Sequence, residues 1–390
     1  MKVRLGDYIE QVRGISYNPT DLRDFLDDNC VPLLRATNIK DGNINLDNVL
    51  YISKHKVSKK QFLKKGDILI CTSSGSKELV GKAAYIEQDV LMTFGAFCKV
   101  VRPKTNCQKY IGHYFQSPYY RMHISYLSSG ANINNIKNEH IDNLEIPLPP
   151  LDEQRSIAAV LDKVSDLIAK RRAQLDKLDE LVKARFVEMF GDPLIDSGRY
   201  TKVPLGSLVE VGSSKRIFEK EYVREGIPFY RTKEIVELSK GNQITTELFI
   251  TRQRYDEIKK EYGVPKAGDL LISAVGTIGV IWIVDGKNNF YFKDGNLLRV
   301  VTNEKFTPIY LKHLLETLIG AYKLRMSSGT AYAALTISAL KEMLVYEVPI
   351  EEQKQFASFV EQTDKSKLTI HQSLDKLEIL KKALMQQYFG

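Results

Sequence analysis

The sequence predicts a mixed α/β protein in which two tandemly repeated α/β modules are joined by two long antiparallel coiled-coil helices. Two observations carry this prediction. Short motifs of the first half recur about 200 residues later, as expected for a duplicated unit. Each module is also followed by a long segment with apolar residues at coiled-coil spacing. The 390 residues are 43% hydrophobic, which is enough to build more than one core of ordinary size.

Three short motifs define the repeat. They are Phe190-Gly191 and Phe389-Gly390, 199 residues apart; Pro150–Gln154 and Pro349–Gln353, also 199 apart; and Gly66-Asp67 and Gly268-Asp269, 202 apart. Offsets that drift by a few residues are expected when the loops of a duplicated unit gain insertions. We therefore divide the chain into a first module (1–150), a first helix (151–191), a second module (192–349) and a second helix (350–390).

Each module has the pattern of an α/β domain. Strand-like runs bounded by Gly and Asn occur at 32–37, 67–72 and 98–101. A helical stretch follows in each module, at 110–126 and 308–326.

The segment from Leu151 to Met189 contains neither Pro nor Gly, and its apolar residues alternate at spacings of four and three. Adding 199 to these residue numbers gives a similar row of apolar residues on the second helix. The predicted seam residues are Ile157, Leu161, Val164, Ile168, Leu175, Leu178, Val182, Met189, Phe356, Val360, Ile370, Leu374, Leu377, Leu384 and Tyr388. The glycine of each Phe-Gly motif supplies the helix stop. Antiparallel pairing would set the modules at opposite ends of a rod of roughly 57 Å, or about 17 base pairs of DNA. An ordinary helical hairpin between two enzyme domains is the alternative.

Composition makes nucleic acid a plausible partner and gives no sign of a membrane. Lys and Arg number 56 against 48 Asp and Glu, a formal charge of +8, and basic side chains gain by displacing the counterions of phosphates. No apolar run has the length of a membrane span, and the start does not resemble a signal peptide. The cysteines lack metal-ligand spacing, so we expect reduced, buried thiols in a cytoplasmic protein and no metal site. They are Cys30, Cys71, Cys98 and Cys107.

Motifs that catalysis would need are missing from the sequence. The segment Gly75–Ala83 departs from a P-loop in spacing and lacks the final hydroxyl that would bind Mg²⁺. No HExxH occurs, and no Asn-Pro-Pro or Asp-Pro-Pro followed by an aromatic residue is present to receive a flipped base. Phe94-Gly95-Ala96-Phe97 is best interpreted as strand-like core. We expect no catalytic residue in this chain.

The combination of a module, Pro-Leu-x-Glu-Gln, a long helix and Phe-Gly, repeated once, resembles the specificity (S, HsdS-type) subunit of type I restriction-modification systems. The resemblance covers essentially the whole chain, although Glu347-Val348-Pro349 departs from Leu148-Pro149-Pro150 of the first copy. It implies that the modules are target recognition domains, each reading one half of a split, asymmetric site in double-stranded DNA. It also implies that the helices dock two methyltransferase (M) subunits and that restriction/translocase (R) subunits join the complex. S-adenosylmethionine, ATP and Mg²⁺ would be bound by those partners, and none by this chain.

Candidate DNA contacts combine a basic run with three polar loops in each module. Basic side chains position a protein on phosphates, and Arg, Asn, Ser and Thr side chains can read base edges. The candidates are Arg35, Thr37, Asn38, Lys54, Lys56, Lys59, Lys60, Ser74, Ser76, Lys77, Ser129, Asn132, Arg231, Thr232, Lys233, Arg252, Arg254, Ser273, Thr277, Ser328, Thr330 and Tyr332. Lys64 and Lys65 extend the basic run. The alternative for these residues is a solvated basic face and ordinary turn chemistry.

Two other functions fit the same sequence. One is a specificity subunit that serves a fused nuclease-methyltransferase. The other is a coiled-coil adaptor that binds proteins and no DNA, which salt-dependent DNA binding would exclude.

Overall fold

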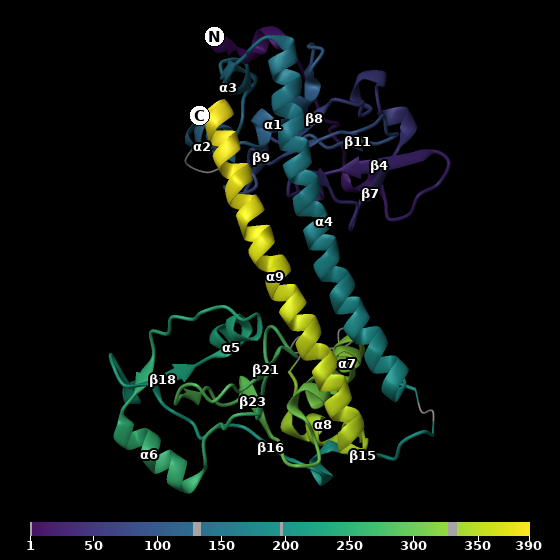
Figure 1. Cartoon of the computed structure of the whole chain (residues 1–390). Coiled ribbons are helices and arrows are strands. Elements are labelled where there is room, and N and C mark those ends of the chain that lie inside the picture. Colours follow the sequence, from purple (N-terminus) through teal and green to yellow (C-terminus); the bar gives the residue numbers. More distant parts are fainter. Residues whose placement is uncertain (1, 128–133, 196–197, 327–333) are drawn as a thin grey trace. The chain divides into compact units, whose positions relative to one another are not determined.

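The computed structural model describes residues 2–127, 134–195, 198–326 and 334–390 (Figure 1). The chain forms two compact units. Unit 1 comprises Met1–Ala173 and His371–Gly390, and unit 2 comprises Gln174–Ile370. Each unit therefore combines one α/β module with parts of both long helices.

Unit 1 contains two four-stranded sheets. The first has the order β10-β8-β12-β2 and is antiparallel, with β2 (Ile9–Arg13), β8 (Ile68–Cys71), β10 (Ala83–Tyr85) and β12 (Cys98–Pro103). The second has the order β11-β4-β7-β3, in which β11 and β4 are parallel, with β3 (Leu22–Arg23), β4 (Cys30–Leu34), β7 (Leu50–Ser53) and β11 (Thr93–Phe94). Short pairs are β1 (Lys2–Arg4) with β14 (Glu145–Pro147), β5 (Ile39–Lys40) with β6 (Asn43–Ile44), and β9 (Ser73–Ser74) with β13 (Asn134–Asn135).

Unit 2 repeats this plan. Its antiparallel sheet has the order β16-β23-β20-β21, with β16 (Glu210–Gly212), β20 (Leu270–Ser273), β21 (Ile281–Ile283) and β23 (Leu297–Val301). Its mixed sheet has the order β17-β19-β18-β22, with β17 (Tyr222–Val223), β18 (Ile227–Tyr230), β19 (Phe249–Ile250) and β22 (Tyr291–Phe292). Strands β18 and β22 are the parallel pair, and β15 (Lys202–Pro204) pairs with β24 (Leu344–Tyr346). The same strand orders in both units confirm the duplication inferred from sequence.

The helices of the modules agree with the prediction except at one break. The stretch predicted at 110–126 is two helices, α1 (Gln108–Gln116) and α2 (Pro118–Leu127). Ser117 between them has φ −72° and ψ 149°, because a residue that precedes proline is pushed out of the helical region. In unit 2 the single helix α7 (Pro308–Met326) forms as predicted. The remaining module helices are α3 (Asn138–Asp142), α5 (Thr232–Ser239), α6 (Arg252–Glu261) and α8 (Ile337–Glu342).

Short 3-10 helices connect these elements. They are Leu5–Tyr8, Pro19–Asp21, Ala36–Asn38, Lys54–Lys56, Lys59–Gln61, Leu205–Ser207 and Glu219–Glu221. Ala36–Asn38 ends the strand expected at 32–37. The lysines of 54–61 lie on two further such turns, Lys54–Lys56 and Lys59–Gln61.

The long helices α4 (Leu151–Phe190) and α9 (Ile350–Phe389) pack together within each unit (Figure 1, teal and yellow). In unit 1, Ile157 and Leu161 of α4 share a core with Met385 and Phe389 of α9. In unit 2, residues from the other end of α4 share a core with residues from the start of α9, which include Val182, Phe186, Phe356 and Val360. The pairing is antiparallel in each unit, as predicted, and every predicted seam residue is buried or half-buried.

The two Phe-Gly motifs anchor the helix ends. Phe389 is fully buried in unit 1, with its ring centroid 5.2 Å from that of Tyr110. Phe190 is equally buried in unit 2, 4.9 Å from the ring of Tyr310. Gly191 takes φ +85° and donates its N–H to Val187, which is the helix stop expected of glycine. The motif thus combines an aromatic anchor with a helix C-cap.

The glutamine of the Pro-Leu-x-Glu-Gln repeat also has a structural role. Gln353 is fully buried; its Nε2 donates to the carbonyl oxygens of Val348 and Lys305, both at 2.9 Å. Its Oε1 accepts the N–H of Thr307 at 2.8 Å, immediately before α7 begins. The counterpart Gln154 donates to the Pro149 carbonyl at 2.7 Å, while its own buried Oε1 has no partner among the described residues. The repeated glutamine therefore ties the start of each long helix to its module.

Candidate DNA-binding surface

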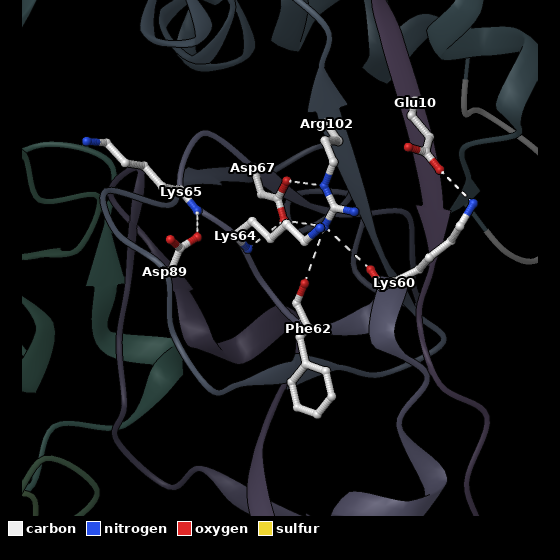
Figure 2. Close-up of polar contacts among 8 residues, drawn as sticks. All are labelled: Glu10, Lys60, Phe62, Lys64, Lys65, Asp67, Asp89 and Arg102. Atoms are coloured by element: carbon white, nitrogen blue, oxygen red, sulfur yellow. Dashed lines mark hydrogen bonds and ion pairs between the residues drawn. The ribbon is translucent and has the colours of Figure 1, made fainter.

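The basic run of unit 1 is fixed to the sheet by one buried ion pair (Figure 2). Asp67 is fully buried and accepts hydrogen bonds from Arg102 Nε at 2.7 Å and Nη2 at 2.8 Å. The hydrogen bonds with this carboxylate raise the pKa of the Arg102 guanidinium. Arg102 Nη2 also donates to the carbonyl oxygens of Lys60 and Phe62, and the Lys64 N–H donates to Asp67. The loop that carries the lysines is therefore held in one conformation at its base.

Unit 2 repeats this anchor. Asp269 is buried and pairs with Arg299 Nη2 at 2.6 Å, and it accepts the N–H of Lys266 at 2.8 Å. Gly268 before it takes φ +90°, as Gly66 takes φ +88° before Asp67. The repeated Gly-Asp motif is thus a turn with a buried carboxylate, and glycine permits the positive φ.

The lysines of the basic run differ in how far they are free to meet phosphates. Lys56 forms an ion pair with Asp21, and Lys60 lies 3.3 Å from Glu10 (Figure 2). Lys54 donates to a backbone carbonyl. Lys59, Lys64 and Lys65 are exposed, and within the described ranges their ammonium groups make no hydrogen bond or ion pair. In Figure 2 the Lys65 side chain extends away from Asp89, which is bonded to its backbone N–H.

Three loops meet at one edge of the antiparallel sheet in unit 1. Thr72, directly after β8, donates through its N–H and Oγ1 to the carbonyl of Phe97 at 2.9 and 3.2 Å. Its own carbonyl accepts the N–H of Ile136 at 2.8 Å, and β9 pairs with β13 beside it. The loops around residues 72–77, 95–97 and 134–136 therefore form one surface, which we call the loop edge.

Unit 2 has the same loop edge. Ala274, directly after β20, donates to the Asn296 carbonyl at 2.8 Å and accepts from the Leu335 N–H at 2.9 Å. Val275 forms a β-bridge with Ala334 where β9 pairs with β13 in unit 1. Both units thus present equivalent loops, which carry different side chains.

The predicted DNA contacts fall into three groups by exposure, and a fourth group lies outside the described residues. The exposed ones are Thr37, Lys54, Lys56, Lys59, Lys60, Ser76, Lys77, Lys233, Arg252 and Thr277. The half-buried ones are Arg35, Ser74, Arg231, Thr232 and Arg254. Asn38 and Ser273 are fully buried. Ser129, Asn132, Ser328, Thr330 and Tyr332 lie outside the described residues.

The structure does not support Asn38 and Ser273 as base contacts. The Asn38 side chain accepts the Arg35 N–H and donates to the carbonyls of Asn45 and Asp47, which closes a turn. The Ser273 hydroxyl donates to the Thr277 carbonyl and accepts the Val280 N–H at 2.9 Å. Each polar group is therefore already used inside the fold, because turn formation and base reading employ the same residue types.

The arginines predicted in unit 2 are all paired with acids. Arg231 lies 3.1 Å from Glu234, and Arg252 lies 3.1 Å from Asp256. Arg254 contacts Glu221 at 2.9 Å and a second glutamate on its own helix. Their charge is locally balanced, which weakens long-range attraction to phosphates.

Phe97 is a residue that sequence reasoning placed in the core. Phe94 is fully buried as expected, but the Phe97 ring is 68% exposed at the loop edge. In duplex DNA the base faces are stacked on one another, so an exposed aromatic ring beside polar loops is suited to apolar contact with a thymine methyl group. The sequence Phe-Gly-Ala-Phe did not predict that Phe97 is exposed, because four residues are too few to distinguish a strand from the tip of a loop.

Within the described ranges, no group of three or more His, Cys, Asp or Glu side chains could hold a metal ion. No helix there combines the length and apolar character that crossing a membrane requires. Cys30, Cys71, Cys98 and Cys107 are free and buried, as expected.

Two units of one fold, each with an equivalent loop edge, define a protein built from two repeated modules. Residues 1–178 and 198–379 match the family described as "Type I restriction modification DNA specificity domain". The chain therefore belongs to the family of type I restriction-modification specificity subunits, which confirms the resemblance inferred from sequence. Specificity subunits of these systems are non-catalytic, and the enzymatic activity lies in their partner subunits.

Curated relatives and solved structures agree with this family. The EcoKI specificity subunit of Escherichia coli K12 is 39% identical over 173 residues, and the StySPI specificity subunit of Salmonella potsdam is 38% identical over 173 residues. Each match covers 44% of this chain and only 37% of the relative. The MjaIX specificity subunit of Methanocaldococcus jannaschii is 27% identical over 76% of this chain and 70% of its own. A solved S subunit from M. genitalium shares the fold over 100% of this chain and 96% of its own, with a TM-score of 0.54 and 15% identity.

Proposed function

We propose that this chain is the DNA sequence-specificity subunit of a type I restriction-modification complex and binds a bipartite, asymmetric site in double-stranded DNA. Each unit reads one half-site. The long helices dock two methyltransferase subunits, and restriction subunits join through them. S-adenosylmethionine, ATP and Mg²⁺ are bound by these partners in the cytoplasm, and the chain itself supplies recognition.

The observation that carries this proposal is the pair of equivalent loop edges with different chemistry. In unit 1 the paired strands at this edge are Ser73–Ser74 and Asn134–Asn135, which are polar. In unit 2 the corresponding bridge joins Val275 and Ala334, which are apolar. Polar side chains can hydrogen-bond to base edges, whereas small apolar ones contact a thymine methyl group. Two different edges favour two different half-sites.

The outer faces of the long helices support the docking of partner subunits. Apolar side chains are exposed on both helices in both units, where neither the seam nor a module covers them. They are Val160, Leu167, Leu181 and Val187 of α4 and Leu368, Ile379 and Leu380 of α9, between 38% and 69% exposed. Exposed apolar side chains on both helices offer area that a partner subunit could bury.

The decisive experiment is a methylome of a host that carries the cognate methyltransferase gene, with and without this chain. We expect one split motif with a fixed unread gap to be methylated only when the chain is present. Unchanged methylation would remove the chain as the reader and favour the adaptor alternative. A specificity subunit for a fused nuclease-methyltransferase is distinguished by its gene neighbourhood, which would lack separate methyltransferase and motor genes.

A variant separates the two half-sites. Lys77 is exposed at the loop edge of unit 1, so Lys77→Ala should relax or weaken recognition of one half of the motif and leave the other half unchanged. Lys365→Ala, an exposed lysine on α9, is the matched control and should leave both halves unchanged. Equal effects of Lys77→Ala on both halves would contradict the assignment of one half-site to each unit.

A further inference from the structure

A cavity of about 520 Å³ lies inside unit 1, where β5 and α2 approach α4 and α9. Its lining is strongly basic. The cations are Lys40, Lys82, Arg121, Arg172, Lys381 and Lys382, and the carboxylates are Asp41 and Glu378. Six positive against two negative groups leave a formal charge of +4. A concave surface lined by one sign of charge concentrates its field and attracts the opposite ion.

Both carboxylates are already used by one arginine. Arg172 Nη2 lies 2.9 Å from Glu378 and its Nη1 lies 3.3 Å from Asp41. Arg121 donates to two backbone carbonyl oxygens at 2.6 and 2.9 Å, which fix its position without neutralising its charge. Within the described ranges, none of the four lysines forms a hydrogen bond or an ion pair. The lining therefore keeps a formal excess of four positive charges, and hydrogen bonds hold two of its cations, Arg121 and Arg172, in place.

The fold itself does not require a lysine at position 381. The residue 199 positions earlier is Val182, which is 3% exposed in the core of unit 2. Burial, and then the nearby Arg172, lower the pKa of the half-buried Lys381 ammonium. Lys367 on the same helix is different, because it pairs with Asp179 at 2.6 Å and Asp364 at 3.4 Å. Asp162 and Glu378 act on the Lys381 pKa in the opposite direction, but neither forms an ion pair with it among the described residues. Lys381 thus places an ammonium group where the repeat has an apolar residue.

We propose that this cavity is a phosphate-binding site in which Lys381, Lys82 and Arg121 contact a phosphate-bearing anion. Ammonium and guanidinium groups that converge from two helices and a loop suit the several oxygens of a phosphate. The phosphate comes either from a free anion such as pyrophosphate or from the DNA backbone. The second source rests on the proposed function.

The first test is calorimetric titration of the full-length chain with inorganic pyrophosphate at low ionic strength. Lys381→Val installs the residue of the other repeat and should raise the Kd about tenfold, the effect of losing one charge-assisted contact. Lys367→Ile installs the counterpart Ile168 and removes one positive charge from the same helix, so it is the matched control and should leave the Kd unchanged. Lys82→Met, on a loop outside the helices, should act like Lys381→Val.

The second test measures binding of duplex DNA as a function of salt. If the phosphate belongs to DNA, Lys381→Val lowers the slope of log affinity against log salt by about 0.9, and Lys367→Ile does not. The site is supported if the Lys381 and Lys82 variants lose affinity and Lys367→Ile does not. Loss of pyrophosphate binding identifies a free anion as the ligand, and loss of duplex binding identifies the DNA backbone. Wild-type behaviour of both variants in both assays overturns it.

Two controls keep the outcome interpretable. Lys381→Val should be at least as stable as the wild type in thermal unfolding, because it removes an ammonium group from a half-buried position. The methylome is a separate readout of the proposed function. If Lys381→Val leaves methylation of the split motif, anion affinity and DNA affinity all unchanged, the phosphate-binding site is refuted. The proposed function would stand in that case.

Discussion

Replacing Gln353 by leucine tests whether the repeated glutamine is a structural tie between helix and module. The substitution removes three hydrogen bonds, two to carbonyl oxygens and one from the N–H that precedes α7. At about 1 kcal/mol for each bond, with a further penalty for the buried Val348 carbonyl and a partial gain from the apolar leucine, we expect a loss of about 3 kcal/mol. For a unit of this size that lowers the melting temperature by roughly 6–12 °C.

Gln154→Leu is the control within the same chain. The Gln154 side chain donates one hydrogen bond, to the Pro149 carbonyl, and its Oε1 is already buried without a partner among the described residues. Removing an unpaired buried oxygen offsets the lost bond, so this variant should lie within about 1 kcal/mol of the wild type. Scanning calorimetry of the two variants gives the comparison. The reasoning is refuted if Gln154→Leu destabilises as much as Gln353→Leu.

Three further predictions concern the ion pairs and the aromatic anchor. The hydrogen bond with His113, and then that with Lys109, lower the pKa of Asp162 to about 2 from 3.8, so its contribution of about 1–2 kcal/mol is fully present above about pH 5 and lost as pH falls through 2. Urea unfolding should therefore show that Asp162→Asn loses more stability at pH 7 than at pH 2.5, and equal losses would contradict this assignment. Phe389→Ala should cost about 3–5 kcal/mol in urea unfolding, against under about 0.5 for the exposed Ile379→Ala. Arg102→Met leaves the buried Asp67 charge unpaired and should lower the free energy of unfolding by about 3–5 kcal/mol. Lys60→Met, at the exposed pair with Glu10, should lower it by under about 1 kcal/mol. Equal losses would contradict the burial argument.

The parts of the fold that follow from local periodicity were predictable. The seam of α4 and α9 was found because a row of apolar residues at spacings of three and four describes one face of a helix. That row omitted Phe186 and Met385, which are also buried, because each module covers a wider stripe of the helix than a partner helix alone would. The sequence analysis predicted one helix across Ser117, because apolar residues on both sides continue the helical pattern. Pro118 was the signal that a helix ends there.

The candidate site was predicted less well, because loops and long-range pairs carry little local signal. Serine and asparagine occur both in turns and in base recognition, so Asn38 and Ser273 could not be separated from exposed loop residues by type. The pair of Arg252 with Asp256 lies four residues apart on one helix and could be inferred. Arg102 and Asp67 meet only through the pairing of β12 with β8, which the sequence does not specify.

Unit 1 is completed by residues 371–390, which are translated only after the whole of unit 2. At about 5–20 residues per second, a ribosome needs roughly 10–40 s to pass from residue 173 to residue 390. Throughout that interval the nascent chain holds Ile157 and Leu161 without Met385 and Phe389, which later cover them. Until then this apolar stripe of α4 lacks the part of its core that α9 supplies. The core of unit 1 is complete only after the chain has been extended through Phe389.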